Sequence, residues 1–154
     1  MKSTAVEQLL HSVDTAINNI QSLSNISALE KSYLTGYLIV FISGVYEEAI
    51  ETIINEKIAY LNAPYVSQYV QKTIDQWFRN PCCKNITQLL GKFNDSWKEQ
   101  FKKLPNQSRT ALDSIVNNKN SLAHGSPISV TFQDAVKYFN DSRTIIEVLD
   151  DTIL

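Results

Sequence analysis

The sequence predicts an all-helical protein that forms a single domain over residues 1–154. Apolar residues recur at three- and four-residue spacings, and only four glycines and four prolines interrupt the 154 residues. Apolar and polar residues rarely alternate, so strands and hairpins have few places to begin. A chain of this length, with 44% hydrophobic residues, can bury one core. We therefore expect an antiparallel bundle of about six helices with a long, central second helix.

The first two predicted helices are the clearest. Residues 4–23 carry apolar side chains on one face at helical spacing, namely Val6, Leu9, Leu10, Val13, Ile17, Ile20 and Leu23. Ser27 followed by Glu30 is typical of a capping box, which predicts a second helix from there to about Leu61. Its stretch from Tyr37 to Val45 is apolar on almost all sides, as expected for a helix surrounded by others.

Prolines and glycine divide the rest of the chain. Pro64 ends the second helix, and the breaks at Asn80-Pro81 and Pro105 leave predicted helices over residues 65–78 and 85–103. The aromatic residues of these helices are spaced as core residues, not as platforms for stacking bases. A fifth helix over residues 108–123 ends at Gly125, which suits a left-handed cap. The sixth begins at Thr131 or Phe132 and continues to the end of the chain.

Several functional classes are disfavoured. The N-terminus lacks a basic stretch leading into an apolar segment, and the run from Tyr37 to Tyr46 covers about half of the ~20 residues that span a bilayer. We expect a cytoplasmic protein with no membrane anchor. The adjacent Cys82 and Cys83 are expected to be small apolar residues near a helix start. His11 and His124 lie far apart, so no metal site and no cofactor is expected.

Charge is unevenly distributed along a chain whose net charge is −2. Residues 61–119 carry nine Lys/Arg and four Asp/Glu, which gives 9 − 4 = +5, whereas both flanking segments are acidic. This middle segment is either a solvated basic surface that balances its acidic neighbours or a patch that binds phosphates. On the second helix, Glu47, Glu48 and Glu51 are either a solvated edge or paired carboxylates.

The end of the fifth predicted helix combines two unusual features. At about 100° per residue, Lys119 falls within the apolar stripe formed by Leu112, Ile115, Val116, Leu122 and Ala123. A lysine there must extend its ammonium to water, pair with another group, or face a cavity or subunit interface. Asn117, Asn120, Ser121 and His124 form a separate polar face, so the helix presents an imidazole beside hydrogen-bonding groups.

The run Lys119-Asn120-Ser121-Leu122-Ala123-His124-Gly125 resembles the motif of the HEPN superfamily, in which an arginine, a polar residue and then a histidine lie near the end of a late helix. It is most similar to the RiboL-PSP-HEPN or MAE-type branch, where Ala-His-Gly commonly ends the motif. The resemblance also implies an acidic residue on an early long helix, here Glu47 or Glu48.

In this chain, Lys119 occupies the arginine position, which keeps the charge but loses the planar bidentate fork for phosphate. Arg109 cannot replace that arginine within one subunit. It precedes His124 by fifteen residues, or about 22 Å along a helix.

The resemblance implies metal-independent RNA cleavage, in which the ribose 2′-hydroxyl attacks the neighbouring phosphate. His124 would be the base or acid, Lys119 would stabilise charge on the phosphate, and Asn120 would orient the imidazole or bind substrate. Lys119 and His124 lie about 140° apart around a regular helix. A homodimer with two motifs facing one cleft, common in the family, would ease this separation.

Three functional hypotheses follow. The first is an endoribonuclease acting as a toxin or defence effector, with an antitoxin or another defence protein as a possible partner. The second is a catalytically inactive HEPN-like module that binds RNA or protein. The third is an interaction-only helical bundle unrelated to the family.

Overall fold

The structure, a computed structural model, describes residues 1–127 and 129–154, and the described residues form helices without strands. The helices are α1 (Thr4–Ser22), α2 (Ala28–Ala59), α3 (Pro64–Trp77), α4 (Cys83–Phe93), α5 (Asp95–Lys102), α6 (Asn106–Ala123) and α7 (Phe132–Ile153). The all-helical prediction is confirmed. The described residues hold seven helices where about six were expected.

Side-chain caps fix where the main helices begin. The Ser3 hydroxyl accepts a hydrogen bond from the backbone N–H of Val6 at the start of α1. The predicted capping box of Ser27 and Glu30 opens α2, and a second one, formed by Thr131 and Asp134, opens α7. Each box satisfies backbone N–H groups that the first helical turn would otherwise leave without partners.

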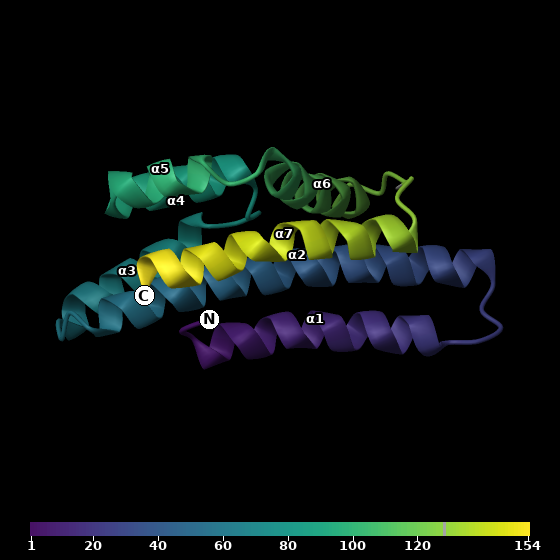
Figure 1. Ribbon diagram of the computed structural model, residues 1–154, viewed down its shortest axis with the longest axis horizontal. Coiled ribbons are helices and arrows are strands. Elements are labelled where there is room, and N and C mark those ends of the chain that lie inside the picture. Colours follow the sequence, from purple (N-terminus) through teal and green to yellow (C-terminus); the bar gives the residue numbers. More distant parts are fainter. Residues whose placement is uncertain (128) are drawn as a thin grey trace.

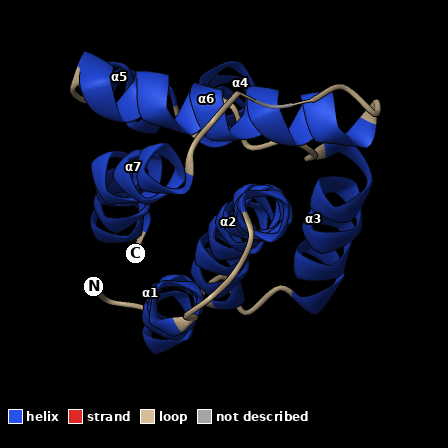
Figure 2. Cartoon of the chain, turned by 90° about the vertical axis from the view of Figure 1, so that its right-hand side faces the viewer, coloured by secondary structure: helices blue, strands red, loops and turns tan. Residues whose placement is uncertain are grey.

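Three long helices lie side by side, and α6 crosses over two of them. In Figure 1, α1 runs opposite to α2, whereas α7 runs in the same direction as α2. The expected antiparallel arrangement therefore applies to α1 and α2 but not to α2 and α7. The reason is that α3 to α6 carry the chain back to the end of the molecule where α2 starts. Figure 2 shows α4, α5 and α6 lying across the long helices, and α6 packs against both α2 and α7.

Helix α2 lies against the core, but it is not surrounded over Tyr37 to Val45 as expected, because Tyr37 and Val40 are 56% and 45% exposed. Its buried side chains form one broad face of the helix, which includes Leu38, Ile42 and Tyr46. The Tyr46 hydroxyl lies 2.8 Å from Ser142 Oγ on α7. Burial raises the pKa of Tyr46, so the phenol stays neutral and serves as a hydrogen-bonding group inside the core.

A buried carboxylate joins the two ends of the chain. Asp150 is fully buried on α7 and accepts hydrogen bonds from the backbone N–H groups of Lys2 and Ser3. The Ser3 hydroxyl in turn donates to Glu56 on α2 at 2.7 Å. These contacts fasten the start of α1 to the ends of α2 and α7 and satisfy a charge that burial would otherwise penalise.

The predicted helix over residues 85–103 is two helices. The backbone at Asn94 is extended, with φ −160° and ψ 120°, and its side chain accepts from the N–H of Ser96 to start α5. Cys82 and Cys83 lie at the start of α4, as expected, and are half-buried. Burial, with a contribution from the neighbouring Asp113, raises the pKa of the Cys83 thiol to about 12.

The aromatic residues of α3 are not core residues, contrary to the expectation from their spacing. Tyr65, Tyr69 and Trp77 are 86%, 73% and 77% exposed, and Ile74 is the one residue of α3 that is buried. The spacing is helical, but the helix contacts the rest of the protein along a narrow line. Among the described residues, no helix is both long and apolar enough to cross a membrane.

Candidate functional site

The last turn of α6 ends in a hydrogen-bonded cap that positions His124. The helix stops at Ala123, His124 is the cap residue, and Gly125 follows in the left-handed region with φ 73°. The N–H of Gly125 donates to Leu122 O at 3.0 Å, and that of Ser126 donates to Ser121 O at 2.9 Å. These two bonds form a complete Schellman motif, which confirms the predicted glycine cap. The cap leaves the His124 side chain exposed at the end of the helix.

Lys119 lies one turn earlier and points toward another part of the chain. It is half-buried, and its ammonium donates a 2.6 Å hydrogen bond to Asn80 Oδ1 in the loop between α3 and α4. A lysine in an apolar stripe was expected to reach water, pair with another group or face a cavity, and Lys119 pairs with another group. The partner is a neutral amide, so the positive charge of Lys119 is held in place without being neutralised.

Asn80 connects Lys119 to the acidic edge of α2. Its backbone is in the left-handed region with φ 56°, a conformation that asparagine tolerates better than most residues. Its N–H donates to Glu47 Oε2 at 3.0 Å, and Arg79 Nη1 donates to Glu47 Oε1 at 3.1 Å. The structure thus unites Glu47, Arg79, Asn80 and Lys119, which we call the polar cluster. Of the two candidate acidic residues, it contains Glu47, whereas Glu48 is exposed on α2.

A second carboxylate lies one helical turn beyond the polar cluster. Burial raises the pKa of Glu51, and the nearby charges of Glu47 and Asp75 raise it further. Within the described residues, Glu51 Oε1 is buried without a hydrogen-bond partner. The edge of α2 is therefore partly desolvated at Glu51, while Glu47 forms an ion pair with the Arg79 guanidinium.

The structure does not bring Asn120 and His124 into the polar cluster with Lys119. Asn120 is half-buried, and no hydrogen bond between described residues involves its side chain or the His124 imidazole. Lys119 is directed toward the polar cluster, while His124 is exposed at the helix end. Arg109 is on α6, in the same helix as His124, so its predicted separation from the histidine along the helix stands. Among the described residues, no group of three or more His, Cys, Asp or Glu could hold a metal ion.

Sequence reasoning missed two members of the polar cluster. Asn80 was recognised only as part of an Asn-Pro break, and Arg79 only as part of the basic segment. Arg79 lies close to the motif lysine through Glu47 and Asn80, and its side chain is 61% exposed. The contact from Asn80 to Lys119 spans 39 residues, so helical periodicity cannot reveal it.

Comparison with protein families assigns the chain. Residues 7–154 match the model of the RiboL-PSP-HEPN family. The chain belongs to this family. HEPN domains are helical and typically act as ribonucleases or bind RNA. No curated protein and no solved structure matches the chain. The predicted resemblance is thereby confirmed over almost the whole length of this HEPN protein, including the segment with Lys119 and His124.

Proposed function

We propose that this HEPN protein is a metal-independent endoribonuclease in which His124, Lys119 and Asn120 are the catalytic residues. The observation that carries the proposal is the last turn of α6. It presents an exposed imidazole at a rigid cap and, five residues earlier, a lysine that a neutral side chain holds in place. This arrangement offers a proton-transfer group and a fixed positive charge on one helix end.

In the proposed reaction, His124 accepts the proton of a ribose 2′-hydroxyl as the 2′-oxygen attacks the adjacent phosphorus. The bond from phosphorus to the 5′-oxygen of the next nucleotide breaks, and the leaving oxygen takes up a proton from water. The products are a 2′,3′-cyclic phosphate end and a 5′-hydroxyl end. A histidine suits the proton transfer because imidazole exchanges protons near neutral pH. Asn120, one helical turn before His124, would orient the imidazole or bind the substrate.

Lys119 is suited to stabilise the phosphate. An ammonium has three N–H donors, and Asn80 accepts one of them, which leaves two for phosphate oxygens. We further propose that Arg79 contacts the same phosphate through the planar fork that Lys119 lacks. Nη1 of Arg79 donates to Glu47 and Nη2 donates to the Asp75 carbonyl, and the 61% side-chain exposure supports a role for the remaining N–H groups.

We also propose that the protein forms a homodimer in which two α6 ends face one cleft. An exposed apolar stripe runs along the first half of α2 through Leu29, Tyr33, Tyr37 and Val40, which are 61%, 70%, 56% and 45% exposed. Leu122 lies against Gly36 on the same part of α2, so the stripe is next to the last turn of α6. An exposed apolar stripe of this kind is typical of a protein interface.

A second candidate function is a catalytically inactive HEPN module that binds RNA or protein. It is favoured by the presence of Lys119 at the arginine position and by the absence, within the described residues, of a hydrogen bond that orients the His124 imidazole. A role as a toxin or defence effector in the cytoplasm, with an antitoxin as partner, rests on the family resemblance. So does the proposal that the chain acts as one domain.

The experiment compares initial rates of cleavage of a fluorescently labelled single-stranded RNA in buffer containing a chelator. Relative to wild type, we expect His124→Ala to lower the rate by about 10²- to 10⁴-fold, because it removes the proton-transfer group. Lys119→Ala should also lower the rate, whereas Lys119→Arg should retain or raise it. His11→Ala is the matched control, because His11 is the other histidine and is exposed on α1.

Equal rates for wild type and His124→Ala would contradict the catalytic assignment. If no version cleaves RNA but wild type binds it more tightly than Lys119→Ala, the inactive module is the better account.

A further inference from the structure

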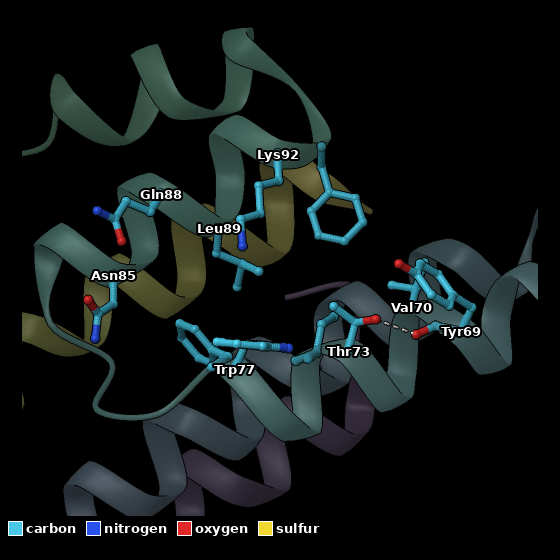
Figure 3. A pocket seen from close by; sticks show the side chains of 11 residues that line it. Tyr69, Val70, Thr73, Trp77, Asn85, Gln88, Leu89 and Lys92 are labelled. Atoms are coloured by element: carbon cyan, nitrogen blue, oxygen red, sulfur yellow. Dashed lines mark hydrogen bonds between the residues drawn. The ribbon is translucent and has the colours of Figure 1, made fainter.

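A cleft lies between α3 and α4, the two helices that flank the loop with Arg79 and Asn80. Its volume is about 300 Å³, and α3 and α4 supply most of its walls. In Figure 3, Thr73 and Trp77 from α3 face Leu89 and Lys92 from α4 across this space. A concave site lined by apolar and polar groups of both helices is typical of a small-ligand site.

The α3 wall of the cleft is aromatic and exposed. Tyr69 and Trp77 both line the cleft although they are 73% and 77% exposed, and Phe93 closes it from the end of α4. Large aromatic side chains bury most of their surface in a folded protein unless a partner covers them. An exposed indole beside a cavity offers a flat face on which another ring can stack.

The α4 wall supplies polar groups. Asn85, Gln88 and Lys92 line the cleft, and Lys92 lies in the last turn of α4. The Gln88 amide can donate to and accept from the edge of a nucleobase, and Asn85 Oδ1 can accept, while the ammonium can contact a phosphate. Among the described residues that line the cleft, Lys92 is the charged one, and its positive charge favours an anionic ligand.

The cleft is physically connected to the candidate catalytic site. The Asn85 amide donates from Nδ2 to the backbone oxygens of Arg79 at 2.9 Å and Asn80 at 2.8 Å. Asn80 in turn accepts from Lys119. One cleft residue therefore holds the loop that positions the polar cluster.

We propose that this cleft binds one unstacked base of a single-stranded RNA, with the ring against Trp77 and the backbone phosphate beside Lys92. The proposal rests on the proposed RNA substrate and adds a second contact, outside the scissile phosphate. It favours single-stranded over double-stranded RNA, because a paired base cannot leave its stack without an energetic cost. The combination of aromatic, amide and cationic groups favours a nucleotide over an apolar helix of another protein, which would cover the Gln88 amide and the Lys92 ammonium without pairing them.

The test measures binding of a labelled single-stranded RNA by fluorescence anisotropy in a His124→Ala background, which prevents cleavage during the titration. Trp77→Ala should raise the dissociation constant by about 5- to 100-fold, because it removes a stacked base contact. Trp77→Tyr should restore most of the affinity. Tyr60→Ala is the matched control: Tyr60 is 80% exposed and lies outside the cleft, so its removal should leave the affinity unchanged. Double-stranded RNA of the same sequence should bind all these variants alike.

The outcomes separate this inference from the proposed function. If wild type cleaves RNA but Trp77→Ala binds it as tightly as the His124→Ala parent does, the cleft proposal is overturned and the ribonuclease proposal stands. If Trp77→Ala weakens RNA binding but wild type does not cleave RNA, the proposal that the cleft binds a base is supported and the catalytic proposal fails. Absence of any RNA binding overturns both. If Trp77→Ala leaves RNA affinity unchanged and converts a dimer into a monomer, the cleft binds a second copy of the chain instead.

Discussion

At the scale of single residues, the sequence identified the unusual residue but not its partner. The apolar stripe on residues 108–123 marks Lys119 as misplaced, which predicts that its side chain needs a partner or an outlet. The partner, Asn80, is 39 residues away, and its side-chain oxygen accepts from Lys119 at 2.6 Å. Neither periodicity nor spacing encodes such a contact. By contrast, the local cap at Gly125 was predictable because only the next few residues determine it.

The cap at Gly125 yields a test at this scale. Gly125 has φ 73°, so Gly125→Ala places a side chain in the left-handed region and should destabilise the protein by about 1–2 kcal/mol. Gly44→Ala is the matched control, because a Cβ there meets no atom within 4 Å and the residue is inside α2. That change should stabilise the protein by about 0.5–1 kcal/mol.

Urea denaturation of both variants measures these differences in the free energy of unfolding. Equal effects of the two substitutions would show that the left-handed cap does not constrain the end of α6.

At the scale of helices, apolar periodicity predicts where most helices lie. It is wrong about the single helix over residues 85–103 and about the burial of the α3 aromatics. The apolar pattern of Ile86, Leu89, Phe93 and Trp97 continues without interruption, so it cannot show that Asn94 adopts an extended backbone and starts a new helix. The sequence Asn94-Asp95-Ser96, with a capping residue first, was the available signal. The α3 aromatics show the reverse problem. Helical spacing predicts a face, but it cannot show whether a neighbouring helix covers that face.

The exposed stripe on α2 carries a prediction at this scale. Wild type should sediment as a dimer of 2 × 17.5 = 35 kDa, and Tyr33→Glu should sediment as a 17.5 kDa monomer, because it places a charge in the proposed interface. Tyr60→Glu adds the same charge at an 80% exposed aromatic outside the stripe and should remain dimeric.

Analytical ultracentrifugation across a range of concentrations distinguishes these species. Wild type that stays monomeric at every concentration would rule out this interface.

At the scale of the whole molecule, the helical fold and the family were predictable, while the directions of the helices were not. Composition and periodicity establish helices around a central α2, and the HEPN motif carries the family. That α7 lies parallel to α2 depends on the path of α3 to α6, which no local pattern sets. This path also brings Glu47, Arg79 and Asn80 to Lys119. The candidate site is therefore a product of the topology as well as of the motif.

The central claim is that this HEPN protein cleaves RNA through the ribose 2′-hydroxyl. Its most direct test is an end-group determination on products from a single-stranded RNA and from the same strand with 2′-O-methyl riboses, with His124→Ala as the control for contaminating nucleases. We predict 2′,3′-cyclic phosphate and 5′-hydroxyl ends from the RNA, and no cleavage of the methylated strand. Cleavage of the methylated strand, 5′-phosphate ends, or identical cleavage by His124→Ala would contradict the claim.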